Sequence, residues 1–131
     1  MSTTKGKNIL IVDDNKDFTR LYETFLKYDG YKVDVFTDPV DALSSFKKYT
    51  YDLVLLDLKM PQMNGIELSH KIKEIDSNVI ICFTTADRTY IKELRKGILD
   101  IDKIVLYKPV LLKDLKNKID WLLSHQEIIN Q

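Results

Sequence analysis

Acidic, hydroxyl and amine side chains stand directly after four apolar runs of this 131-residue chain. They are Asp13 and Asp14, Asp57, Thr84 and Thr85, and Lys108. Three carboxylates brought together repel one another, and a hard divalent cation with oxygen ligands, typically Mg²⁺, relieves that repulsion. A lysine and a hydroxyl beside a metal-bound carboxylate suit an incoming phosphoryl group, because they neutralise and hydrogen-bond its oxygens while the carboxylate attacks. The residue types therefore indicate Asp57 as an aspartyl-phosphate nucleophile, provided that the fold brings them together.

Each of these short motifs has a more ordinary explanation when it is taken alone. An Asp-Asp pair after a strand is commonly a turn or a helix cap, a Thr pair is commonly an N-cap, and Lys-Pro is commonly a surface corner. Their joint placement at one edge of one sheet, which chance would rarely produce, is what indicates a function.

Short apolar runs predict the strands that place these residues. The runs are 8–12, 31–36, 53–56, 79–83 and 104–107. Apolar residues at helical spacing follow each run, and a chain that alternates strands with helices forms a parallel sheet covered on both faces. The run 31–36 alternates apolar with charged residues, as an edge strand does. We therefore predict an α/β fold of the flavodoxin-like, doubly wound type, a (βα)5 three-layer sandwich with strand order 2-1-3-4-5.

The predicted helices carry expectations about single residues. Asn15 is expected to cap the first helix, and Pro39 to begin the second, with Val40 facing inward. The last helix is expected at 111–123, with Leu111 on its apolar side. Because the carboxyl ends of parallel strands share one edge, the candidate site residues should converge there.

Composition narrows the classes of protein to which the chain can belong. Its length suits one domain, placed at 7–124 between a disordered leader at 1–6 and a tail at 125–131. Twenty basic residues balance twenty acidic ones, which argues against direct binding to nucleic acid. The single cysteine, Cys82, cannot form an internal disulfide, and no apolar stretch is long enough for a signal peptide or a membrane span. We therefore expect a cytoplasmic protein without membrane association.

Four motifs give the chain a specific resemblance over residues 7–123. They are Ile11-Val12-Asp13-Asp14, Leu56-Asp57-Leu58-Lys59-Met60-Pro61-Gln62-Met63-Asn64-Gly65, Thr85-Ala86 and Lys108-Pro109. Together they resemble the receiver (CheY-like) domain of two-component response regulators, here free-standing. The resemblance implies Mg²⁺-dependent transfer of a phosphoryl group from a sensor histidine kinase or a histidine phosphotransfer protein. It implies a phosphoacceptor rather than an enzyme, with only self-phosphotransfer and autodephosphorylation.

The resemblance also implies a role for each site residue. Asp57 is the phosphoacceptor, and Asp13 and Asp14 belong to a site for Mg²⁺ or Mn²⁺. The backbone carbonyl of Lys59 is a further metal ligand, and Lys108 contacts the phosphate. Thr85 is preferred to Thr84 as the switch hydroxyl, because it precedes the small residue Ala86, which leaves access to the site. Phosphorylation would switch contacts with a downstream protein target, in a monomer or a phosphorylation-dependent dimer.

Two positions depart from the pattern of the family that the chain resembles. Val105 stands three residues before the lysine, where most receivers have the Tyr or Phe that turns inward on activation. Ile101-Asp102 replaces the frequent Gly-Ala before the fifth strand. The output face formed by the fourth helix, fifth strand and fifth helix would then use a different readout, or the domain would mainly pass phosphoryl groups onward.

Trp121 is the residue of the output face that the sequence singles out. It falls roughly 120° away from the apolar stripe of the last helix, so we expect it to be partly exposed. Residues 87–118 carry nine basic and five acidic side chains, and an aromatic anchor beside positive charge suits an acidic partner. The alternative is a tryptophan lying flat along the helix edge without a binding role.

Lys59 and Asp87 each lie two residues beyond a site residue and carry opposite charges. We expect them to pair across the route by which water reaches the phosphate. His70 and His125 are expected to be solvated surface residues.

Two other classes of protein share part of the predicted chemistry. A phosphatase of the haloacid-dehalogenase type also uses an aspartyl nucleophile, but it places Asp-x-Asp after the first strand and usually carries a cap insertion. A flavodoxin-like cofactor binder needs a loop rich in Ser, Thr and Gly after the first strand, where this chain has Asp13 and Asp14. The receiver remains the leading interpretation.

Overall fold

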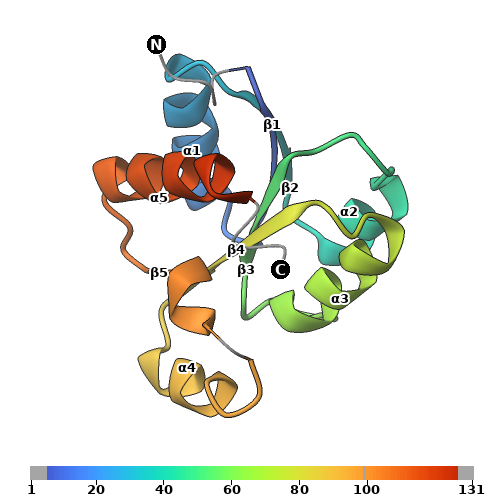
Figure 1. The fold of residues 1–131 in the computed structure, drawn as a ribbon, viewed down its shortest axis with the longest axis vertical. Helices are drawn as coiled ribbons and strands as arrows, with labels where there is room; N and C mark the ends of the chain where they lie inside the picture. The colour runs from blue at the N-terminus through green and yellow to red at the C-terminus, as the bar shows by residue number, and fades with distance from the viewer. Residues whose placement is uncertain (1–5, 99, 127–131) are drawn as a thin grey trace.

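A five-stranded parallel sheet forms the middle layer of the described part of the chain (Figure 1). The structure is a computed structural model that describes residues 6–98 and 100–126. The strands are β1 (Asn8–Val12), β2 (Lys32–Phe36), β3 (Leu53–Asp57), β4 (Ile80–Thr85) and β5 (Val105–Tyr107). Their order is β2-β1-β3-β4-β5 and every neighbouring pair is parallel, which confirms the predicted topology. Residues 1–5 of the predicted leader and 127–131 of the predicted tail lie outside the described residues.

Helices cover both faces of this sheet. In the described chain they are α1 (Lys16–Tyr28), α2 (Pro39–Ser45), α3 (Gly65–Ile75), α4 (Arg88–Leu94) and α5 (Leu112–Ser124). Helices α1 and α5 lie on one face, and α2, α3 and α4 contribute to the core on the other (Figure 1). None of the described helices is long and apolar enough to cross a membrane.

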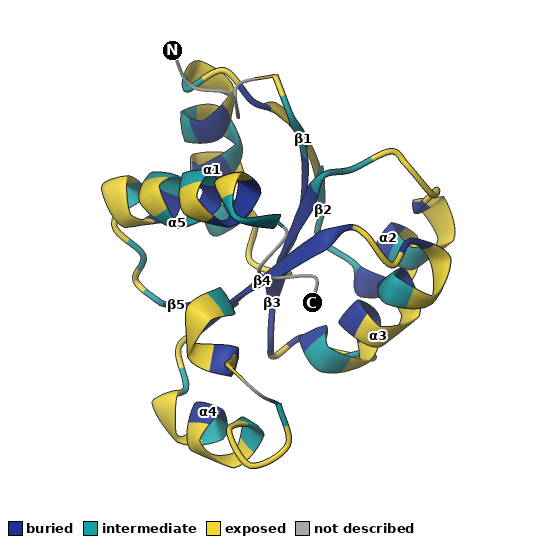
Figure 2. Cartoon of the chain, in the orientation of Figure 1, coloured by how far each residue is buried: buried dark blue, intermediate teal, exposed yellow. Residues whose placement is uncertain are grey.

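The side-chain alternation of the central strands divides the core between these two faces. Ile9 and Ile11 of β1 pack with α1 and α5, whereas Leu10 and Val12 pack with α2 and α3. All residues of β3 are buried, and Figure 2 shows the dark central strands between helices with exposed outer sides. Burial on both faces explains the uninterrupted apolar runs by which these strands are recognised in the sequence.

Side-chain caps start four of the helices at the carboxyl edge of the sheet. Asn15, Asp38, Asn64 and Asp87 each accept hydrogen bonds from backbone N–H groups in the first turn of the helix that follows. Gly65, the first residue of α3, lies so close to the end of β3 that a Cβ there would be 2.4 Å from the carbonyl oxygen of Asp57. The glycine therefore lets the loop after Asp57 fold back tightly against the strand.

Two of the expectations about single residues are wrong. Val40 is exposed because α2 buries Pro39 and Ala42 instead, and Val40 lies about 100° around the helix from Pro39. Leu111 is also exposed, because it has extended backbone and precedes the first turn of α5. Helix α4 ends at Leu94, and a short 3₁₀ helix, Ile101–Ile104, that was not predicted leads into β5.

Candidate functional site

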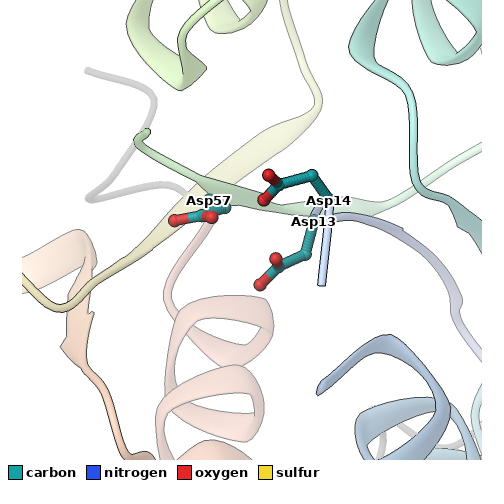
Figure 3. A group of neighbouring side chains, drawn as sticks. All are labelled: Asp13, Asp14 and Asp57. Atoms are coloured by element: carbon teal, nitrogen blue, oxygen red, sulfur yellow. The ribbon is translucent and has the colours of Figure 1, made fainter. Parts of the chain in front are cut away.

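Three carboxylates meet where β1 and β3 end. Each of Asp13, Asp14 and Asp57 offers an oxygen, and these oxygens lie within 4.8 Å of one another (Figure 3). Asp13 and Asp57 are buried, whereas Asp14 is exposed. Asp13 is oriented locally, because its Oδ1 accepts a hydrogen bond of 3.0 Å from the backbone N–H of Asn15. The predicted convergence of these three acids is therefore present.

Lys108 brings a positive charge to the same place from the end of β5. Its Nζ lies 2.8 Å from Asp13 Oδ2 and 3.4 Å from Asp57 Oδ2. Its backbone N–H donates to the carbonyl oxygen of Thr85 at 2.8 Å, which aligns the ends of β4 and β5. One ammonium group against three carboxylates leaves an excess of negative charge.

The electrostatics of Asp57 reflect this excess. Burial, and after it the negative charge of Asp13, raises the pKa of Asp57 to about 6, although Lys108 and the backbone N–H of Lys59 act in the opposite direction. Asp13 Oδ2 is buried and has the Lys108 ammonium at ion-pair distance, but no hydrogen bond of good geometry among the described residues. A buried oxygen with spare lone pairs beside two further carboxylates suits a hard divalent cation.

The hydroxyl groups predicted for the site are at the end of β4. Thr84 and Thr85 are both buried, and Thr84 is the neighbour of Asp57 in the β3–β4 ladder. Thr85 Oγ1 accepts a hydrogen bond of 3.0 Å from the N–H of Asp87, in the turn that begins α4. Ala86, between Thr85 and Asp87, is exposed.

The predicted pair of Lys59 and Asp87 is confirmed. Lys59 Nζ lies 2.5 Å from Asp87 Oδ2, and this hydrogen bond lowers the pKa of Asp87. The Lys59 ammonium also lies 5.4 Å from the centre of the Tyr90 ring. The two side chains join the loop after β3 to the start of α4 beside the acidic cluster.

Val105 and Trp121 do not belong to the acidic cluster. Val105 is buried among the apolar residues on the α4 side of the sheet. Trp121 is 40% exposed, as predicted, and stacks on His125 with ring centres 4.3 Å apart. His125 is partly exposed, and His70 is exposed as predicted. Both Val105 and Trp121 line an open groove of about 610 Å³ between β5 and α5.

The sequence did not predict two contacts between an aromatic ring and a cation near the end of β5. The Phe18 ring centre lies 4.5 Å from the Lys108 ammonium, and the Tyr107 ring centre lies 4.0 Å from the Arg88 guanidinium. The spacing of residues along the sequence carries no signal for a contact between Phe18 on α1 and Lys108 at the end of β5.

Comparison with known proteins decides the family. The sequence profile of the response regulator receiver domain matches residues 9–120. The chain belongs to the response regulator receiver family. It is therefore a receiver domain of two-component phosphorelay signalling, a family whose members act as phosphoacceptor switches.

Individual relatives agree with this assignment. The response regulator ArlR of Staphylococcus aureus is 36% identical over 118 residues, which are 90% of this chain and 53% of ArlR. The receiver thus spans about half the length of the curated relatives it matches.

Solved structures show the same fold. A CheY-like receiver domain protein from Methanospirillum hungatei JF-1 superposes with a TM-score of 0.80 at 28% identity, covering 95% of this chain and 98% of that one. The response regulator TrrA from Thermotoga maritima, solved in complex with Mg²⁺ and BeF, has a TM-score of 0.75 at 30% identity, covering 88% of this chain and 98% of that one.

Proposed function

We propose that Asp57 accepts a phosphoryl group from a phosphohistidine of a sensor histidine kinase or a histidine phosphotransfer protein. The observation that carries this proposal is the cluster of Asp13, Asp14 and Asp57 within 4.8 Å, with the Lys108 ammonium 3.4 Å from Asp57. A bond forms between a carboxylate oxygen of Asp57 and phosphorus while the P–N bond of the donor breaks. The imidazole leaves with the bonding electron pair, and the phosphoryl group ends on Asp57.

The acidic cluster fits a divalent cation. Mg²⁺, or Mn²⁺ in its place, would be held by the carboxylates of Asp13, Asp14 and Asp57 and by the backbone carbonyl of Lys59. Its positive charge would offset the repulsion between the carboxylates and the approaching phosphate. The buried Asp13 Oδ2 without a well-formed hydrogen bond supports this assignment, as does the structure of TrrA in complex with Mg²⁺ and BeF.

The remaining residues of the site act on the phosphoryl oxygens. Lys108 contacts them with its ammonium group, and Thr85 donates a hydrogen bond from its hydroxyl. The small side chain of Ala86 leaves room for the donor. The positions of the largely enclosed Lys108 and the buried Thr85 at the same sheet edge as Asp57 support these roles.

Replacement of the phosphoacceptor tests the proposal directly. With Mg²⁺ and acetyl phosphate, or with a cognate phosphorylated kinase, the intact mass of the wild type should increase by one phosphoryl group. Asp57→Asn should show no adduct, because an amide is not a nucleophile for phosphorus. Asp41→Asn, at an exposed acid of α2, is the matched control and should be labelled like the wild type. An Asp57→Asn protein labelled as fast as the wild type would contradict the assignment.

Removal of divalent cations tests the metal site. Excess EDTA should abolish labelling of Asp57, and added Mg²⁺ or Mn²⁺ should restore it, because the clustered carboxylates otherwise repel the phosphate. The measurement is the fraction of phosphorylated protein by intact mass. Labelling that continues undiminished in EDTA would exclude an obligatory metal.

Under this proposal we expect little catalytic activity beyond the phosphorylation of Asp57. Apart from phosphorylating itself from a donor and losing the phosphate by hydrolysis, it should not turn over substrates, so rapid hydrolysis of small phosphomonoesters would favour a phosphatase. Its further partners would be a downstream protein target or a second copy bound on phosphorylation, with no direct contact to nucleic acid. A cytoplasmic location stays a prediction from the sequence.

A further inference from the structure

Lys108 is enclosed by three groups rather than by the two carboxylates alone. Its ammonium lies 2.8 Å from Asp13, 3.4 Å from Asp57 and 4.5 Å from the ring centre of Phe18. The lysine side chain is only 10% exposed, so little water competes for it. An ammonium over the face of an aromatic ring is attracted by the negative charge of that face, and more strongly when it is desolvated.

The Phe18 ring is itself held in a defined orientation by α1. Tyr22, one turn further along the helix, stacks on it with ring centres 5.9 Å apart and planes 12° apart. Tyr22 is 1% exposed, so its ring is fixed by the core. On the N-terminal side of Phe18, its backbone N–H donates to Asn15 Oδ1, and the backbone N–H of Asn15 donates to Asp13 Oδ1. The start of α1 is thereby tied to the acidic cluster.

We propose that Phe18 is a positioning residue for phosphoryl transfer, and that its ring, backed by Tyr22, holds the Lys108 ammonium beside Asp57. This inference rests on the proposed function of Asp57. Asp13, the closest ion partner of Lys108, is also a proposed metal ligand, so its carboxylate is shared between two positive charges. The Phe18 ring is neutral and has no such second role. The ring therefore keeps the Lys108 ammonium close to Asp57 when Asp13 also binds the metal and attracts Lys108 less strongly.

The chemistry of Tyr22 agrees with a neutral aromatic support. Burial raises the pKa of Tyr22 to about 12, and the nearby carboxylates of Asp13 and Asp57 act in the same direction. The phenol is therefore uncharged at neutral pH and does not pair with Lys108 as an anion.

The test compares Phe18→Leu, which keeps apolar volume and removes the aromatic face, with Phe18→Tyr, which keeps the face. Phe25→Leu is the matched control, since Phe25 is a partly buried residue of the same helix that packs against the apolar core. With saturating Mg²⁺ and acetyl phosphate, Phe18→Leu should slow labelling of Asp57 about three- to tenfold. Phe18→Tyr and Phe25→Leu should be labelled at nearly the wild-type rate. Acetyl phosphate is used because it removes any effect on docking of a kinase.

Two further measurements separate positioning from packing. In NMR spectra, the ε-methylene protons of Lys108 should be shifted upfield by the ring current in the wild type and Phe18→Tyr, and should lose that shift in Phe18→Leu. In a Lys108→Ala background, Phe18→Leu should cause no further slowing, because the ring then has no ammonium to position.

Several results would overturn the proposal. Unchanged labelling of Phe18→Leu would do so, as would equal slowing by Phe25→Leu or a full effect of Phe18→Leu without Lys108. These outcomes leave the wild type phosphorylated on Asp57 and the proposed function intact. A wild type that forms no adduct would instead refute the proposed function, and the positioning role with it.

Discussion

Asp57 combines two properties that oppose each other in a folded protein. It is buried near another carboxylate, which disfavours its charge, yet its function as a nucleophile requires that charge. Lys108 at 3.4 Å offsets only part of the cost. The site is therefore electrostatically incomplete without a cation, and this should be measurable as a dependence of stability on pH.

We expect the metal-free protein to lose stability as pH rises from about 4 to about 6, with Asp57 contributing about 1–2 kcal/mol. The pKa of Asp57 is raised from 3.8 to about 6 in the folded state. Over that interval the unfolded chain releases this proton first, so the unfolded state is favoured as pH increases. The free energy of unfolding in EDTA, measured from pH 4 to pH 7, should therefore fall more for the wild type than for Asp57→Asn.

Addition of Mg²⁺ provides a control for this measurement of stability. Added Mg²⁺ should raise the stability of the wild type at pH 7 more than that of Asp57→Asn, because it binds only the folded acidic cluster. If the two proteins showed parallel pH profiles in EDTA, the raised pKa of Asp57 would be wrong.

At the scale of elements, the site is built by the connections that follow the strands. Asn15, Asn64 and Asp87 cap the helices that follow β1, β3 and β4, so each loop is held in place by the helix that it leads into. The pair of Lys59 and Asp87 joins two of these connections beside Asp57. Its position suits a barrier to the water that hydrolyses the aspartyl phosphate.

We expect Lys59→Ala combined with Asp87→Asn to shorten the half-life of the phosphorylated protein a few-fold. The effect should be small because both side chains are substantially exposed, 60% for Lys59 and 35% for Asp87, and exposed ion pairs are weak. Asparagine is chosen because Asp87 Oδ1 also accepts the capping hydrogen bond from Tyr90, which an amide oxygen can replace. The measurement is the decay of the phosphorylated fraction after the donor is removed.

The pair of Glu93, in the last turn of α4, and Lys96, just after this helix, provides the comparison, since both side chains are exposed and neither belongs to the acidic cluster. Its removal should leave the decay unchanged. A half-life unaffected by the double substitution at Lys59 and Asp87 would refute the barrier.

At the scale of the whole molecule, the acidic cluster and the groove between β5 and α5 are formed by different residues. The groove is lined by apolar residues, Trp121 among them, by the basic residues Arg88 and Lys118, and by the acidic residue Asp114. Val105 is buried here in place of the aromatic expected in most receivers, and Tyr107, two residues further along the same face of β5, lies against Arg88. This surface remains the predicted place for docking an acidic partner.

We expect Trp121→Ala to weaken binding of the kinase, output partner or second receiver by roughly 1–3 kcal/mol, with little change in melting temperature. The stack on His125 is the main ring contact of Trp121, and 40% of the residue is exposed, so its loss should disturb the core little. Partner affinity by titration calorimetry and melting temperature should be measured on the same preparations.

Tyr28→Ala serves as the control for loss of an exposed aromatic, because Tyr28 is 92% exposed at the end of α1. It should change neither quantity. A large fall in melting temperature with unchanged affinity for Trp121→Ala would assign Trp121 to the core and refute its role as an anchor.

The sequence by itself determined the strands, their order and the meeting of Asp13, Asp57 and Lys108. This was possible because strands buried on both faces are uninterrupted apolar runs, and because parallel strands deliver their last residues to one edge. The cap at Asn15 and the pair of Lys59 and Asp87 also follow from local or near-site positions in the chain.

Only the tertiary structure decided which side chains meet across elements. The exposure of Val40 and Leu111 depends on where each helix begins and how it turns toward the sheet, and a shift of one residue rotates a side chain by about 100°. The contact of Phe18 with Lys108 joins α1 to the end of β5, and the contact of Tyr107 with Arg88 joins β5 to α4. Such contacts depend on the packing of side chains from distant parts of the chain, which the spacing of residues along the sequence does not specify.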